Sequence, residues 1–149
     1  MKRAVLVSFA LLVGCGKSDA APDTSIKGTL AVEIRMAVDV TLVPGGDVTL
    51  AFGDGDFGVV DAGTKLSARV LVERLPEAGT TMYNAVFAAP KRSGSPCGDQ
   101  PMTLALSLIR RGENDRVGGG LTAYCGSGVT SGTPARILRL SGSLPLPKP

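Results

Sequence analysis

The sequence predicts an all-β domain, built as an antiparallel sandwich or a small meander barrel of about seven to eight strands with one disulfide. Three observations predict this class. Apolar and polar residues alternate with period two in several segments, Gly-, Pro- and Asp-rich turn signals separate those segments, and no ten-residue window shows helical periodicity. Strands joined by short turns favour a meander, and the alternation leaves barrel and sandwich both open.

The longest alternating segment runs from Thr29 to Val43 and carries an apolar residue at every even position from Leu30 to Leu42. Most odd positions are polar, so one face is apolar and the other is largely polar. Fifteen extended residues at about 3.3 Å each would span about 50 Å. That length is too great for a straight strand in a small domain, so we expect a bend or bulge in this segment.

Turn signals divide the rest of the chain into strands. Pro44-Gly45-Gly46-Asp47 is the first of them, and similar clusters occur at 53–56, 76–79 and 112–115. A stretch rich in Gly, Pro and Ser at 90–101 is expected to be a longer loop. The remaining strands are expected at 48–52, 57–60, 65–75, 80–89, 102–110, 117–125 and 136–144.

The first residues have the features of an export signal. Lys2 and Arg3 precede an apolar run over residues 4–13 that only Ser8 interrupts. A charged start, a short apolar run and small residues at its end are typical of a secretory signal peptide. A membrane-spanning helix needs about 20 apolar residues. The segment therefore predicts export and not a permanent span.

The segment ends in Leu12-Val13-Gly14-Cys15, which resembles the lipobox of bacterial lipoproteins. The resemblance covers about the first fifteen residues and implies that Cys15 is acylated, with palmitate among the acyl groups, and becomes the mature N-terminus. One acyl chain holds a protein only reversibly, but bacterial lipoproteins carry two or three. Gly16 is not the aspartate associated with inner-membrane retention in enteric bacteria, so the resemblance favours the outer membrane over the inner. An ordinary signal peptide with an incidental cysteine is the alternative.

This interpretation divides the chain into four parts. Residues 1–14 are the lipoprotein signal peptide, 15–27 the acylated N-terminus with a flexible polar tether, 28–145 a single β domain, and 146–149 a tail. Removal of residues 1–14 from 149 leaves 135 residues, which is enough for one domain with a core.

The mature chain is almost neutral. The signal segment carries two of the sixteen basic residues and none of the thirteen acidic ones, so fourteen against thirteen leaves a net charge of +1. Such a chain offers no electrostatic case for a nucleic-acid partner. The basic pairs Lys91-Arg92 and Arg110-Arg111 are expected to be solvated ends of strands or loops.

With Cys15 assigned to lipid, Cys97 and Cys125 remain as an even pair in an oxidising compartment. Folding the hairpin at 102–125 about Glu113 and Asn114 places Thr103 near Cys125, with Cys97 a short loop away. We therefore expect a disulfide, which would stabilise the fold by about 3.5 kcal/mol on the chain-entropy model. The chain has no Cys-x-x-Cys motif, so this bond is expected to be a structural link and not a redox centre.

Residue types needed for most catalytic and metal sites are missing from the sequence. The chain has no histidine, which removes Ser-His-Asp and Cys-His arrangements as well as His-containing zinc sites. Asp54-x-Asp56 would begin a calcium loop only if Gly58 and Lys65 were oxygen ligands, so a turn is expected there. We expect no enzyme activity, no cofactor and no metal site.

A nucleotide site is also not expected. Gly16-Lys17-Ser18 matches the end of a phosphate-binding loop, but Leu11 stands where the first glycine should be. The glycines at 118–120 are expected to mark a bulge or a close backbone approach, where a ligand could also come near.

Two functions are compatible with these features. The first is a lipid-anchored cell-envelope protein without catalytic activity, acting as a structural or protein-interaction module. Its partners would be the membrane, through the N-terminal lipid, and other envelope proteins. The alternative is a small β-barrel that binds an apolar ligand, since the long apolar faces could line a cavity. The same faces would be found in a filled core.

Overall fold

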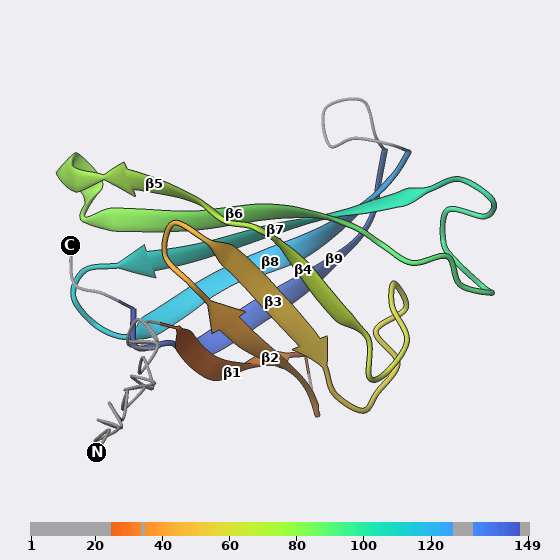
Figure 1. The fold of residues 1–149 in the computed structure, drawn as a ribbon, viewed down its shortest axis with the longest axis horizontal. Coiled ribbons are helices and arrows are strands. Elements are labelled where there is room, and N and C mark those ends of the chain that lie inside the picture. Colours follow the sequence, from red (N-terminus) through yellow and green to blue (C-terminus); the bar gives the residue numbers. More distant parts are fainter. Residues whose placement is uncertain (1–24, 34, 127–132, 147–149) are drawn as a thin grey trace, which may run out of the picture.

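The computed structural model describes residues 25–33, 35–126 and 133–146. Within them the fold is all-β: nine strand segments form one antiparallel, nearly closed barrel-like sheet, and no α-helix occurs (Figure 1). The predicted fold class is confirmed. The strands are β1 (Ile26–Val32), β2 (Met36–Leu42), β3 (Asp47–Phe52), β4 (Lys65–Arg69), β5 (Leu71–Leu75), β6 (Thr80–Ala88), β7 (Met102–Arg111), β8 (Arg116–Cys125) and β9 (Thr133–Ser143), with a 3₁₀ turn η1 (Pro76–Ala78) after β5.

The strands follow a meander around the barrel. Their order in the sheet is β4-β3-β2-β1-β9-β8-β7-β6-β5, and the first and last strands of the chain pair through contacts such as Leu30 opposite Gly142. Only Val70 separates β4 from β5. One extended path therefore pairs with β3 through its first half and with β6 through its second half. This shared path brings the two edges of the sheet together.

Side chains that point inward form one continuous apolar core. In β2, Val38, Val40 and Leu42 are buried, whereas Asp39 between them is exposed. Burying a side chain of this size contributes about 1.5–3 kcal/mol. The period-two pattern in the sequence thus becomes the division between the inside and the outside of the barrel.

The long alternating segment is a hairpin, so the expectation of one bent strand was wrong. Val32 pairs with Met36, so the chain reverses its direction between these two residues. Glu33 and Arg35 have φ values of 52° and 68°, which residues other than glycine rarely adopt. The sequence has no Gly, Pro or Asn here to indicate a turn. Because the turn has three residues, even positions stay on the inner face in both strands.

The expected strand at 57–60 is also different, since it lies within the loop between β3 and β4. Phe57, Val59 and Val60 are nevertheless buried, and Phe57 packs edge-on against Phe52 with ring centroids 5.0 Å apart. This loop therefore folds inward and covers the core. Its apolar residues pack against the core without pairing in the sheet.

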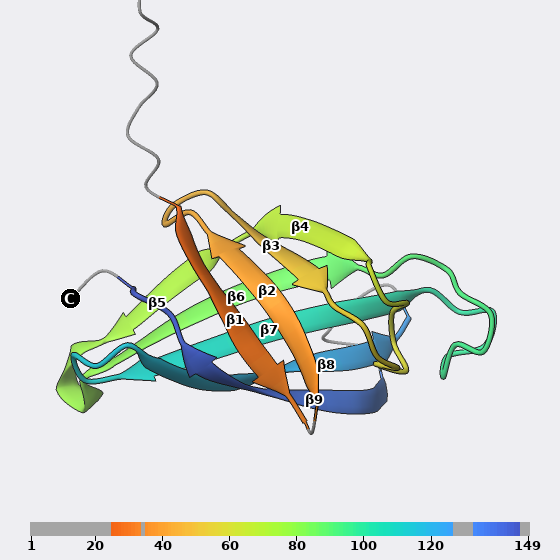
Figure 2. The same ribbon diagram turned by 90° about the horizontal axis from the view of Figure 1, so that it is seen from below.

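The two ends of the barrel differ (Figures 1 and 2). At the turn end, the described chain enters β1, and short turns over 43–46 and 112–115 connect β2 to β3 and β7 to β8. At the loop end, longer connections run over 53–64 and 89–101. Lys27, expected in the tether, belongs to β1, and Leu146, expected in the tail, is buried.

Candidate functional site

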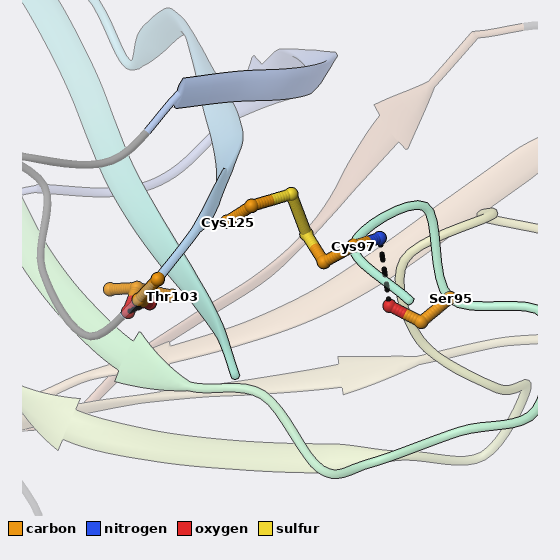
Figure 3. The surroundings of a disulfide bond; sticks show 5 residues. Ser95, Cys97, Thr103 and Cys125 are labelled. Atoms are coloured by element: carbon orange, nitrogen blue, oxygen red, sulfur yellow. Dashed lines mark hydrogen bonds between the residues drawn. A yellow bond between two sulfur atoms is a disulfide. The ribbon is translucent and has the colours of Figure 1, made fainter. Parts of the chain in front are cut away.

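The predicted site residues fall in two parts of the chain. Cys15, the predicted lipidation site, lies outside the described residues, as do the signal segment 1–14 and most of the expected tether. Cys97 and Cys125 form the predicted disulfide, with Cα atoms 5.2 Å apart. Figure 3 shows this bond at the loop end of the barrel.

The disulfide holds loop 89–101 against the sheet. Cys125 is the last residue of β8 and pairs with Met102, the first residue after the loop. The Cys97 N–H donates to Ser95 Oγ at 3.2 Å, and Thr103 Oγ1 donates to the Gly126 carbonyl oxygen at 3.1 Å (Figure 3). Covalent and polar contacts thus fix the loop at its middle and the β8 end beside it.

Arg92 links the two long loops to each other. Its Nη1 donates to the Val60 carbonyl oxygen at 3.3 Å, and its Nε lies 3.6 Å from Asp61 Oδ1. The Arg92 side chain is only 17% exposed, against 72% for Asp61. The prediction of a solvated basic pair was therefore wrong for Arg92, because loop 89–101 folds over loop 53–64, but Lys91 is exposed.

A hollow of about 300 Å³ opens at the loop end. Both signs of charge and several hydrogen-bonding groups line it, since its polar residues are Lys91, Arg92, Ser95, Asp99 and Gln100. Such a lining suits the polar groups of a protein surface better than an apolar molecule.

The apolar ligand of the alternative hypothesis finds less support. Inward-facing side chains fill the barrel as one cluster, and residues such as Leu50, Leu104 and Leu108 are 0% exposed. The other hollows found among the described residues are open and involve outer strand faces and turns, including one of about 470 Å³ beside Gly118 and Gly119. The packed core favours a structural role for the apolar faces.

Loop 53–64 has the turn expected from its Gly and Asp residues. The Gly58 N–H donates to Asp56 Oδ1 at 2.9 Å, which is the geometry of an Asx turn. Within residues 25–33, 35–126 and 133–146, no three His, Cys, Asp or Glu side chains gather as metal ligands.

The glycines of β8 allow the close backbone approach that the sequence predicted. A Cβ atom at Gly119 would overlap the carbonyl oxygen of Ser107 on β7, whereas one at Gly118 would meet nothing within 4 Å. A glycine is therefore required at 119 by the distance between the two strands.

Arg110 is the clearest residue that sequence reasoning missed. It was expected at a solvated strand end, but it is 1% exposed inside the turn end of the barrel. Its Nε donates to the Asn114 carbonyl oxygen and its Nη2 to that of Glu113, both at 3.0 Å. Its Nη1 donates to the Leu146 carbonyl oxygen at 3.3 Å. Arg110 thus ties the C-terminal segment and the β7–β8 turn to the core.

Tyr83 on β6 lies in the same region and is 4% exposed. Burial raises the pKa of its hydroxyl, and the positive charges of Arg110 and Arg74 partly oppose that rise. The phenol is therefore neutral across the physiological range, and it serves packing at the turn end.

No family model matches the chain, no curated protein matches it, and no solved structure matches it. The described segments contain no helix that is long and apolar enough to cross a membrane.

Proposed function

We propose that the chain is a lipid-anchored protein of the bacterial cell envelope that has no catalytic activity and binds other envelope proteins through its loop end. The anchor in this proposal is the acylated Cys15, exposed by removal of residues 1–14. The lipobox-like Leu12-Val13-Gly14-Cys15 supports it, and so does the disulfide, which belongs in an oxidising compartment. Gly16 supports the outer membrane as its destination.

The observation that carries the binding role is the construction of the loop end. Loops that a rigid scaffold holds in place are common binding elements. Here the barrel supplies the scaffold, the Cys97–Cys125 bond holds loop 89–101, and Arg92 joins that loop to loop 53–64. The hollow that residues such as Lys91, Asp99 and Gln100 line carries both signs of charge, and this lining suits a protein partner.

Photo-crosslinking in native envelopes tests this proposal. A photoreactive phenylalanine replaces exposed Lys91 in the full-length protein, and a matched variant carries it at Ile137 on the outer wall, which is 58% exposed. We expect a reproducible protein adduct at Lys91 and none at Ile137. The adduct should weaken when Cys97→Ser and Cys125→Ser release the loop.

Two outcomes would contradict the proposal. If Lys91 and further positions in loops 53–64 and 89–101 give no adduct, the loop end binds no envelope protein. If native mass spectrometry of the gently extracted protein instead finds a small apolar molecule that leaves on mild activation, the ligand-binding alternative gains support.

A further inference from the structure

The described chain enters the barrel beside an exposed groove at the turn end. Ile26, the first residue of β1, pairs with Leu42 at the end of β2, and the turn over 43–46 follows directly. Pro44 and Gly45 of this turn line a groove of about 590 Å³, whose opposite wall comes from the β4–β5 path. Figure 2 shows the start of β1, this turn and β5 at the same end of the barrel.

Hydrogen bonds between the turn over 43–46 and the β4–β5 path fix the walls of this groove. The Val70 N–H donates to the Gly46 carbonyl oxygen at 3.0 Å, and Arg69 Nη2 donates to the Gly45 carbonyl oxygen at 3.4 Å. These bonds hold the turn against the β4–β5 path at the point where that path leaves β3 for β6. Tyr83 forms part of the lining.

Apolar side chains are exposed around this groove. All five residues of β5 are exposed, because the strand pairs only with β6 and extends beyond the core. The exposed fraction is 68% for Leu71, 39% for Val72 and 41% for Leu75, and Val43 in the neighbouring turn is 36% exposed. A cluster of large apolar side chains on the surface of a small domain marks an interaction surface.

Two guanidinium groups stand among these apolar residues, since Arg69 and Arg74 both line the groove. Within the described part of the chain, the Arg74 guanidinium forms no hydrogen bond or ion pair with another residue. Two carboxylates are near. Asp47 lies opposite Arg69 in the register of β3 and β4. Because side chains alternate along a strand, Glu73 lies on the same face of β5 as Leu71 and Leu75, and Arg74 lies on the other face with Val72. Neither carboxylate lines the groove.

We propose that this surface lies against the phospholipid membrane that holds the anchor. Arg69 and Arg74 bind lipid phosphates, and Leu71, Val72 and Leu75 enter the interface between headgroups and acyl chains. The inference rests on the proposed function, because it requires a lipid at Cys15.

The place where the described chain enters the barrel favours a membrane over a protein segment as the occupant of this surface. Ten residue steps separate Cys15 from Ser25, and even full extension of these steps would span only about 35 Å. The ten residues of β7 alone extend about 34 Å along the barrel. A short tether therefore keeps the turn end near the bilayer and directs the loop end away from it. An extended protein segment paired with β5 is the rival occupant.

The absence of tryptophan from the chain permits a direct test. Leu71→Trp places one reporter on the surface, Leu75→Trp a second, and Ile137→Trp a control on the outer wall. The acylated full-length variants are reconstituted into vesicles of phosphatidylethanolamine and phosphatidylglycerol with brominated acyl chains. We expect a blue-shifted, quenched tryptophan in Leu71→Trp and Leu75→Trp, and a water-exposed, unquenched one in Ile137→Trp. Adding Arg69→Gln or Arg74→Gln should lower the ratio of docked to undocked protein about fivefold each.

Flotation of the same vesicles separates the two proposals. If the protein floats with the vesicles but no position is quenched, docking is overturned and the lipid anchor stands. If it floats unquenched and photo-crosslinking at Leu71 in native envelopes captures a protein, β5 binds a protein segment and membrane docking is again overturned. If the protein does not float, the anchor itself is absent and the proposed function fails.

Discussion

The two ends of the barrel are held together by different means. At the loop end, a disulfide and the half-buried Arg92, which contacts Val60 and the exposed Asp61, fix long connections from outside the core. At the turn end, the buried Arg110 draws three carbonyl oxygens inward, and the connections are short. The loop end thus presents fixed polar loops to the solvent, whereas the turn end exposes an apolar strand edge. This difference suits a partner at one end and a membrane at the other.

Removal of the disulfide should have the largest effect on stability. We expect Cys97→Ser with Cys125→Ser to lower the free energy of unfolding by about 3.5 kcal/mol, because the 28-residue separation is no longer closed in the unfolded chain. Urea unfolding followed by far-ultraviolet circular dichroism measures this. Hydrogen exchange should rise in loop 89–101 and not in the turn over 43–46. Equal rises at both ends would contradict the separation of the two regions.

Loss of the buried arginine should come next. Arg110→Met keeps an apolar side chain of similar length but leaves the carbonyl oxygens of Glu113, Asn114 and Leu146 without their donor. We expect a loss of about 3 kcal/mol in urea unfolding, or about 1 kcal/mol for each hydrogen bond.

The matched variant at the loop end is Arg92→Met. Arg92 makes one hydrogen bond, to the Val60 carbonyl oxygen, and its ion-pair partner Asp61 is 72% exposed, so a loss of about 1 kcal/mol is expected. Similar losses for the two variants would mean that Arg110 does not hold the turn end as described.

A smaller effect is expected from substituting Gly119, where β8 lies close to β7 near the turn end. Gly119→Ala forces a Cβ atom onto the Ser107 carbonyl oxygen and should cost about 1–3 kcal/mol through displacement of β8 from β7. Gly118→Ala is the control, because its Cβ meets no atom within 4 Å. Thermal unfolding of both variants gives the difference, and an unchanged Gly119→Ala protein would show that the strands are further apart.

The smallest effect concerns pH. The folded state raises the pKa of Tyr83 above its ordinary value of about 10, so the unfolded chain loses this proton first as pH rises. The corresponding stability is present below pH of about 10 and is lost as the pH rises through the higher folded value. Tyr83→Phe should therefore show a shallower decline of unfolding free energy in alkali. Identical slopes for the two proteins would place Tyr83 in a more solvated site.

The core was predictable because alternation is a strong signal when one face of each strand is buried. Val38, Val40 and Leu42 show it, and so do Leu104, Leu106 and Leu108. The β1–β2 turn was missed because Glu33 and Arg35 adopt positive φ without a glycine to mark it. The two halves of the β4–β5 path read as one strand in sequence, since only spatial neighbours reveal that they pair with different strands.

The site was only partly predictable. Cysteine count and hairpin register were enough to predict the Cys97–Cys125 disulfide. The N-terminal motif was enough to predict Cys15 as the lipidation site. The burial of Arg110 could have been predicted from its position, because it occupies an even position of β7, as do the inward-facing residues from Met102 to Leu108. A charged residue at such a position is seldom buried, so composition favoured the opposite interpretation. The groove beside β5 and the contact of Arg92 with Val60 depend on loops meeting in space, which no local pattern records.

Acylation of Cys15 is the claim on which the loop-end and membrane proposals both depend. Native mass spectrometry of the protein extracted gently from its own membranes measures it most directly. The account predicts an intact mass for a chain that begins at Cys15, increased by two or three acyl groups and lowered by the two hydrogens lost in the Cys97–Cys125 bond. A mass without acyl groups on Cys15 would contradict it.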